Sequence, residues 1–169
     1  MVISTAVRNH SLQQSWRHTL LLLILDGSAL INALLPRISK TFEEYAVLEV
    51  VPKVQTYSCT STRTDIVFDV YWSSSLKAET RSKRGIGARR RVTDKVKIPQ
   101  NWRSFLRDNS NKTELFNFLA DKIVKMCSNN AVIVTQEESV VCNKPISLEG
   151  LTHCNHEEAD TRKTRCSRR

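Results

Sequence analysis

The sequence predicts an α/β fold in which helices flank a parallel sheet in three layers. The continuous apolar run Leu20–Leu25 and the β-rich run Ala131–Thr135 are typical of parallel strands that are buried on both faces. Between residues 113 and 126, apolar side chains recur at helical spacing. Because strands alternate with helices along the chain, the sheet is expected to be open and parallel.

The composition is that of a globular intracellular protein. Of the 169 residues, 40% are hydrophobic and 25% are charged, which matches ordinary folded domains. No apolar run approaches the roughly 20 residues that a membrane helix requires. The five cysteines are odd in number and scattered, which favours a reducing compartment. We expect an intracellular protein, with the nucleus favoured over the cytoplasm, and no membrane partner.

The first half of the predicted fold contains two strands that each end in an aspartate. The apolar run Leu20–Leu25 ends at Asp26, and a second short β-rich run covers Asp65–Asp69. Helical patterns lie over residues 29–35 and 42–51, separated by Pro36. A basic stretch over residues 76–91 is expected to be helical despite its two glycines.

The second half is predicted to add two helices and two strands. Trp102, Phe105 and Leu106 have the spacing of a short amphipathic helix. A longer helix follows, with Asn111 or Thr113 as its cap, and ends at Asn129 and Asn130. The third strand is expected over residues 131–135 and a fourth, short one over 140–142.

The net charge of +9 is concentrated in two places. Residues 77–97, called the basic segment below, hold nine bases and two acids, and residues 161–169 hold five bases and no acid. A localised basic stripe is typical of proteins that bind a polyanion, since each base near a phosphate releases condensed counterions. A solvated charged helix or a nuclear-localisation tract explains one such run equally well.

Acidic residues stand where a parallel sheet usually carries its ligands. Asp26 and Asp69 follow predicted strands, and Glu157, Glu158 and Asp160 lie close together near the end of the chain. Clustered carboxylates repel one another unless cations neutralise them, and their oxygens suit Mg²⁺ or Mn²⁺. Two such ions about 4 Å apart support phosphodiester hydrolysis. The structural alternative is that each acid caps a helix or favours a helix N-terminus.

The arrangement resembles the PIN-like domains of flap endonucleases and XPG-type nucleases, whose fold is Rossmann-like. The resemblance rests on the run Ile66-Val67-Phe68-Asp69 followed by the basic stretch from Leu76 to Arg91, which is similar to a strand that enters a basic helical arch. Glu158-Ala159-Asp160 resembles the Glu-Ala-Glu motif of these nucleases. The longer string from His156 to Arg162 (His-Glu-Glu-Ala-Asp-Thr-Arg) also resembles one in uncharacterised animal proteins.

The resemblance implies a two-metal nuclease acting on DNA or RNA. Its metal ligands, for Mg²⁺ or Mn²⁺, would be Asp26, Asp69, Glu158 and Asp160. Lys77 and Arg84 would contact the scissile phosphate, and Trp72, beside the basic segment, can stack on a base. The full set expected to bind nucleic acid is Trp72, Lys77, Arg81, Lys83, Arg84, Arg89, Arg90 and Arg91.

The same resemblance sets the expected domain organisation. It gives an irregular extension over residues 1–19, a partial PIN-like domain over 20–162 with the arch-like segment at 76–97, and a basic disordered tail over 163–169. PIN-like nucleases supply further aspartates about 20 residues after the Glu-Ala-Glu motif, whereas this sequence stops nine residues after Asp160. We therefore expect a sheet that is incomplete at its C-terminal end, completed by a missing segment or a partner chain, and weak or absent cleavage.

Besides the possibility of a degenerate gene fragment with no stable fold, two alternatives remain open from the sequence. In the first, the chain is a non-catalytic nucleic-acid-binding module that uses the basic segment 77–97 alone. In the second, Cys142, His153, Cys154 and His156 bind zinc, although their spacing fits no finger pattern.

Overall fold

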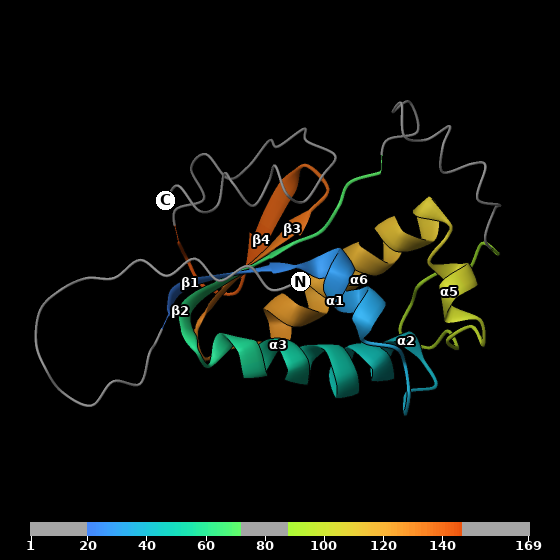
Figure 1. The fold of residues 1–169 in the computed structure, drawn as a ribbon, viewed down its shortest axis with the longest axis horizontal. Helices are drawn as coiled ribbons and strands as arrows, with labels where there is room; N and C mark the ends of the chain where they lie inside the picture. Colours follow the sequence, from blue (N-terminus) through green and yellow to red (C-terminus); the bar gives the residue numbers. More distant parts are fainter. Residues whose placement is uncertain (1–19, 72–87, 147–169) are drawn as a thin grey trace, which may run out of the picture.

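The computed structural model describes residues 20–71 and 88–146 (Figure 1). Within these residues, strands and helices alternate as expected for an α/β protein. The elements are β1 (Leu20–Asp26), α1 (Gly27–Ala33), α2 (Phe42–Glu44), the π-helical turn η1 (Tyr45–Val50), α3 (Val51–Ser58), β2 (Ser61–Val67), α5 (Trp102–Phe105), α6 (Asn109–Met126), β3 (Ala131–Gln136) and β4 (Ser139–Cys142).

The four strands form one open sheet in the order β1-β2-β3-β4. β1, β2 and β3 run parallel, and β4 turns back antiparallel to β3. The predicted open parallel sheet is therefore confirmed for β1, β2 and β3, whereas β4 departs from it, and the sheet is compatible with a Rossmann-like fold. The carboxyl ends of β1, β2 and β3 meet at the same edge, called the carboxyl edge below.

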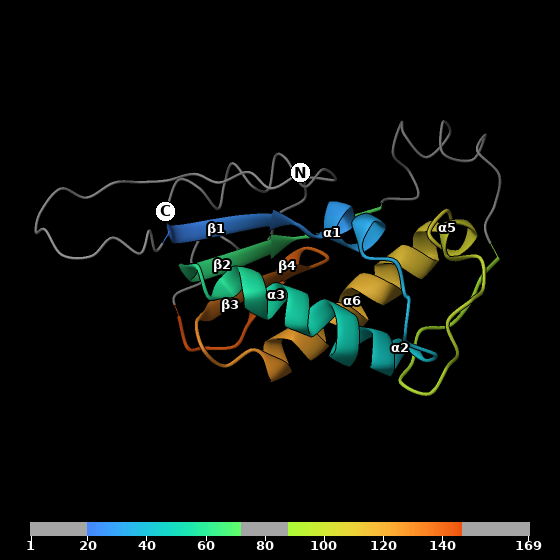
Figure 2. The same cartoon turned by 60° about the horizontal axis from the view of Figure 1, so that its bottom comes forward.

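Helices α3 and α6 cover one face of the sheet (Figure 2). Alternate strand residues, including Leu23, Leu25 and Ile66, point into this core together with the buried side chains of α6. Every described helix that contributes buried apolar side chains contributes them to this core. The parallel strands are joined by helical connections of the kind that parallel pairing requires.

The opposite face of the sheet is also buried. Ile24, Val67 and Ile133 form a second, smaller core there, and none of its members comes from a described helix. On the same face of β2, the Arg63 guanidinium donates two hydrogen bonds, of 2.7 and 2.6 Å, to the buried carboxylate of Asp65. Residues 20–71 and 88–146 thus show two layers, and the third layer stays a prediction.

The helix over residues 42–58 contains a π-helical turn because of a proline. Pro52 has no N–H to donate to the carbonyl of Leu48, and its ring would collide with that carbonyl in a regular α-helix. The backbone widens just before it, and the Val51 N–H bonds to the carbonyl of Ala46, five residues back. The Tyr45 hydroxyl donates to the Leu34 carbonyl at 2.7 Å and ties the widened turn to the end of α1.

Several predicted boundaries are wrong. α6 begins earlier than expected, because Asp108 is the cap and accepts from the Asn111 N–H at 2.8 Å. It ends at Met126, before the two asparagines that were expected to stop it. β2 starts at Ser61 and stops two residues before Asp69. The described end of the predicted basic helix, residues 88–91, is not helical. The strands over 20–26 and 131–136 and the short helix at Trp102 are confirmed.

The predicted extension 1–19, the tail 163–169 and most of the arch-like segment 76–97 lie outside the described residues. Among the residues that the structure describes, no helix combines the length and apolar character needed to cross a bilayer.

Candidate functional site

The carboxyl edge brings two of the predicted ligands to one side of the sheet. Asp26 is the last residue of β1 and pairs in register with Val67 at the end of β2, so Asp69 follows two residues beyond the same level. The backbone N–H of Asp69 donates to the hydroxyl of Ser28 at 3.3 Å, and Ser28 lies in the first turn of the helix that Asp26 caps. A hydrogen bond therefore links the backbone at Asp69 to the helix that Asp26 caps.

Asp26 also has a structural task. Its carboxylate accepts a hydrogen bond from the Ala29 N–H at 2.8 Å, which makes it the N-cap of α1. The structural alternative, in which the acid caps a helix, therefore applies to Asp26. A cap uses part of a carboxylate's acceptor capacity, and two oxygens offer about four lone-pair sites.

Asp69 lies in a polar setting at the start of the loop after β2. The Tyr71 hydroxyl donates to its carboxylate at 3.3 Å. The Lys112 ammonium sits 3.7 Å from the centre of the Tyr71 ring, which places a cation from α6 beside this loop. The Tyr71 side chain thus contacts both the carboxylate that the sequence singled out and a lysine of α6.

A cleft of about 710 Å³ opens at the carboxyl edge between the ends of β2 and β3 and the first half of α6. Asp69 lines it, and Asp26 does not. Glu137 and Glu138, in the turn between β3 and β4, line the same cleft, so three acids face one space. From α6, Asn117 donates to the Glu137 carboxylate at 2.7 Å.

The sequence analysis missed Glu137 and Glu138. The signal that singled out Asp26 and Asp69, an acid just after a predicted parallel strand, applies to them as well. The φ of 52° at Glu137 lies in the left-handed region, as the two-residue hairpin turn between the paired Gln136 and Ser139 requires.

The described acids do not by themselves make a metal centre. Among residues 20–71 and 88–146, no group of three or more His, Cys, Asp or Glu side chains is arranged to hold a metal ion. The donor type is right, since carboxylate oxygens suit Mg²⁺ and Mn²⁺. The remaining predicted ligands, Glu158 and Asp160, lie outside the described residues.

The described end of the basic segment is held on α6 with its arginines at the surface. The Asn111 side chain, fully buried, accepts from Arg89 and from the Arg90 N–H, each at 2.9 Å. Its amide nitrogen donates to the carbonyls of Ala88 and Phe105 at 2.9 and 3.0 Å. A single buried amide therefore fixes the course of the chain over residues 88–90.

Glu114 provides the second anchor for the same stretch. Its carboxylate accepts from Arg89 at 3.0 Å and from the Val92 N–H at 3.0 Å, and Arg91 approaches it at 4.0 Å. Burial alone would raise the pKa of Glu114, but these hydrogen bonds and charges outweigh it and hold the pKa below its usual value. Arg90 and Arg91 remain exposed, the side chain of Arg91 by 84%.

The other predicted site residues cannot be placed. Trp72, Lys77, Arg81, Lys83, Arg84, Glu158 and Asp160 all lie outside the described residues, as do three of the four residues of the zinc alternative. The fourth, Cys142, is a free cysteine whose thiol donates to the Lys144 carbonyl.

No protein family, curated protein or solved structure was found to match this chain.

Proposed function

We propose that this chain contains a PIN-like, metal-dependent phosphodiesterase domain that acts on DNA or RNA. The supporting observation is that the first half of α6 contributes both to the acidic cleft and to the anchoring of the exposed arginines. Thr113 and Asn117 line the acidic cleft, while Asn111 and Glu114 hold the exposed arginines. One helix thus borders both the acids that suit divalent cations and the bases that suit phosphates.

The proposed roles follow the resemblance residue by residue. Asp26, Asp69, Glu158 and Asp160 would hold Mg²⁺ or Mn²⁺, and Lys77 and Arg84 would contact the scissile phosphate. When bound, such ions supply an activated water and stabilise the leaving oxygen. The chain's own described residues would orient the strand, with Arg90 and Arg91 on its phosphates and the Tyr71 hydroxyl holding Asp69 in place.

Cleavage by the full chain tests this proposal. A 5′-labelled flap DNA and a single-stranded RNA are incubated with the protein in Mg²⁺, Mn²⁺ or EDTA. We expect weak cleavage in Mn²⁺ that EDTA stops and that Asp69→Asn reduces by at least about tenfold. Asp121→Asn is the matched control, because Asp121 is an exposed acid on α6 outside the cleft.

Cleavage that survives in Asp69→Asn would contradict the assignment. So would cleavage that Asp121→Asn reduces to the same extent.

A second function, nucleic-acid binding without cleavage, is favoured by the anchored arginines. It requires only the basic segment, in which the exposed Arg90 and Arg91 are anchored through the buried Asn111 and the half-buried Glu114. Fluorescence anisotropy with a labelled 20-nucleotide strand measures the binding as salt is varied. Replacing both arginines by glutamine should lower the slope of log K against log salt by about 0.7 for each phosphate that is no longer neutralised. Replacing Arg107 and Lys125, two exposed bases of the α5–α6 region, should leave the slope unchanged.

The two functions respond differently to EDTA. Binding that EDTA does not alter, with no cleavage in any metal, supports the second function over the first. A salt slope that the Arg90 and Arg91 replacements do not change contradicts the second.

A further inference from the structure

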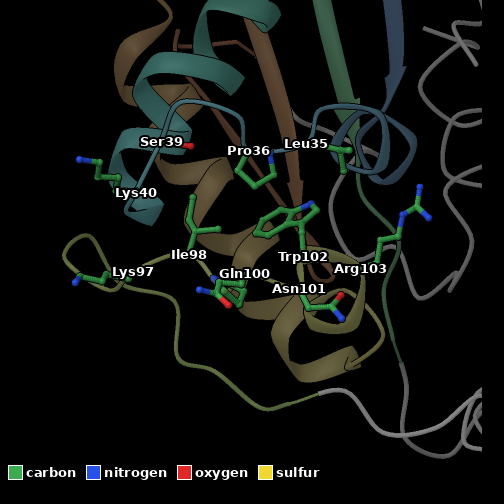
Figure 3. A pocket seen from close by; sticks show the side chains of 11 residues that line it. Leu35, Pro36, Ser39, Lys40, Lys97, Ile98, Gln100, Asn101, Trp102 and Arg103 are labelled. Carbon is green, nitrogen blue, oxygen red and sulfur yellow. The ribbon is translucent and has the colours of Figure 1, made fainter.

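A second cleft, distant in the chain from the acidic one, lies between the loop after α1 and the end of the basic segment (Figure 3). Its volume is about 790 Å³. Leu35 and Pro36 line it from the loop, and Ile98, Pro99 and Trp102 line it from the segment that leads into α5. These five residues form the apolar part of the lining, which includes one aromatic ring.

The two walls of this cleft are fixed to each other by backbone hydrogen bonds. The Ile98 N–H donates to the Lys40 carbonyl at 2.9 Å, and Thr41 and Lys97 form an isolated β-bridge. On the outer side of the loop, the Glu49 carboxylate accepts from the backbone N–H groups of Arg37 and Ser39. These hydrogen bonds therefore hold the two walls of the cleft in a fixed relative position.

Three cations line the cleft. Lys40, Lys97 and Arg103 are exposed, and none of them forms an ion pair with any residue in the described part of the chain. Lys122, by contrast, is paired with both Asp94 and Glu43 nearby. These three side chains can therefore pair with an anionic ligand.

The lining also contains a buried donor without a partner. The indole Nε1 of Trp102 is shielded from solvent and has no hydrogen-bond partner among the described residues, although the residue is only 6% exposed. Such an unpaired buried donor is unfavourable in the free protein, and a ligand acceptor would satisfy it. The ring itself is fixed, stacked on Phe105 with 5.1 Å between centroids and edge-on to Tyr45.

Figure 3 shows that the nitrogen edge of the Trp102 ring faces the side of the cleft on which Leu35 lies. Leu35 is one of the few large apolar residues exposed in the described part of the chain. A ligand oxygen that replaces the Leu35 side chain at this position would reach the indole N–H. The amide side chains of Gln100 and Asn101 lie on the same lining and offer further donors.

We propose that this cleft binds one unstacked nucleotide of a single strand. The base lies on the apolar lining and accepts from Trp102 Nε1, and the phosphate faces Lys40, Lys97 and Arg103. A nucleotide combines a flat apolar face, carbonyl acceptors on its edge and an anionic phosphate, which are the three features that the lining complements. The proposal deepens the proposed function, since the strand would be the one that the basic segment binds.

The test is a titration of the ¹⁵N-labelled full chain with uridine 5′-monophosphate in EDTA, followed by NMR. The chain has three tryptophans, so three indole N–H signals are expected, and Trp102→Phe identifies the one of interest. We expect this signal to move downfield and to saturate with the nucleotide. Uridine should bind at least about threefold more weakly, because it lacks the phosphate, and inorganic phosphate should leave the indole signal in place.

Matched variants locate the binding. Lys97→Gln and Arg103→Gln should each weaken it about threefold to tenfold, as expected for one exposed charge. Lys95→Gln and Arg107→Gln should not, because these exposed bases are near neighbours in sequence that do not line the cleft. Leu35→Ala should bind at least as tightly as the parent chain.

An indole signal that does not move at millimolar nucleotide overturns the proposal, as does a signal that inorganic phosphate moves equally. Equal weakening in Lys95→Gln and Lys97→Gln also overturns it. The titration needs neither metal nor Arg90 and Arg91. If the indole signal does not move but the chain still binds the labelled strand, only this inference is contradicted. If the indole signal moves but the chain does not bind the strand, only the proposed function is contradicted.

Discussion

The side-chain oxygen of Asn111 accepts the backbone N–H of Arg90 at 2.9 Å, although the two residues are 21 positions apart along the chain. The same amide makes three more hydrogen bonds, so all of its donors and acceptors are used within the protein. The described end of the basic segment therefore depends on one buried side chain of α6.

Replacing Asn111 by alanine should destabilise the protein by about 2–4 kcal/mol. The change removes four hydrogen bonds of a fully buried side chain, each worth about 0.5–1.5 kcal/mol, and leaves a cavity in its place. Urea unfolding followed by circular dichroism measures the destabilisation. Strand binding should also weaken, since Arg89 and Arg90 lose their anchor.

The control for this prediction is Asn109→Ala, in the same first turn of α6. The Asn109 side-chain oxygen is buried and has no hydrogen-bond partner in the described part of the chain, so its removal should cost less than about 1 kcal/mol. Equal destabilisation in the two variants would contradict the role given to Asn111.

Replacing Asp26 by asparagine and by alanine should separate its role as a helix cap from its proposed role as a metal ligand. Asparagine still accepts the Ala29 N–H, so the free energy of unfolding should stay within about 0.5 kcal/mol, whereas alanine should lower it by about 1 kcal/mol. If Asp26 is a metal ligand, both variants should lose metal-dependent cleavage. Loss of activity that follows stability alone would reduce Asp26 to a helix cap.

Gly27→Ala should destabilise the protein by about 1–3 kcal/mol despite the better helix propensity of alanine. A Cβ at this position would stand 2.5 Å from two ring carbons of Phe68. That ring cannot move away freely, because it is buried and stacked on Phe116 with 4.4 Å between centroids. In the Phe68→Leu background the same change should cost markedly less, and thermal unfolding of the four proteins measures this coupling.

Alkaline pH should weaken the fold in part through Cys127. Burial raises the pKa of this thiol to about 11 from an ordinary value of 9.0. Below pH 9 the thiol is neutral in both states, and between about pH 9 and 11 only the unfolded chain loses the proton, so stability falls as pH rises. Cys127→Val should flatten this decline in urea unfolding at pH 8 to 11, whereas Cys59→Val, at an exposed position, should not.

The strands and the long helix could be predicted because their patterns are local. Leu20–Leu25 and Ala131–Val134 are apolar without interruption, a pattern typical of strands that are buried on both faces. The start of α6 could not be predicted in the same way. Asn111 is a good cap by type, but its amide is used by residues 88–90 and Phe105, and Asp108 takes the cap.

The candidate site was predictable only in part, for the same reason. Asp26 and Asp69 could be found because strand ends are visible in sequence. That Asp69 shares its cleft with Glu137 and not with Asp26 depends on the packing of α6 against β3, which no local pattern contains. The indole of Trp102 was expected only to pack, and its unpaired nitrogen appears only when its neighbours are in place.

The antiparallel direction of β4 sets a condition on the proposed metal site. Because Cys142 pairs with Ile133, the chain leaves β4 heading for the amino ends of the parallel strands, away from Asp26 and Asp69. Glu158 stands 12 residues after Ile146. Twelve residues reach about 40 Å when extended, and a seven-residue strand is about 23 Å long. The residues between Ile146 and Glu158 are therefore long enough to span the sheet once, from the amino ends of the strands back to the carboxyl ends. If six of them were deleted, the remaining residues would be too short to span this length.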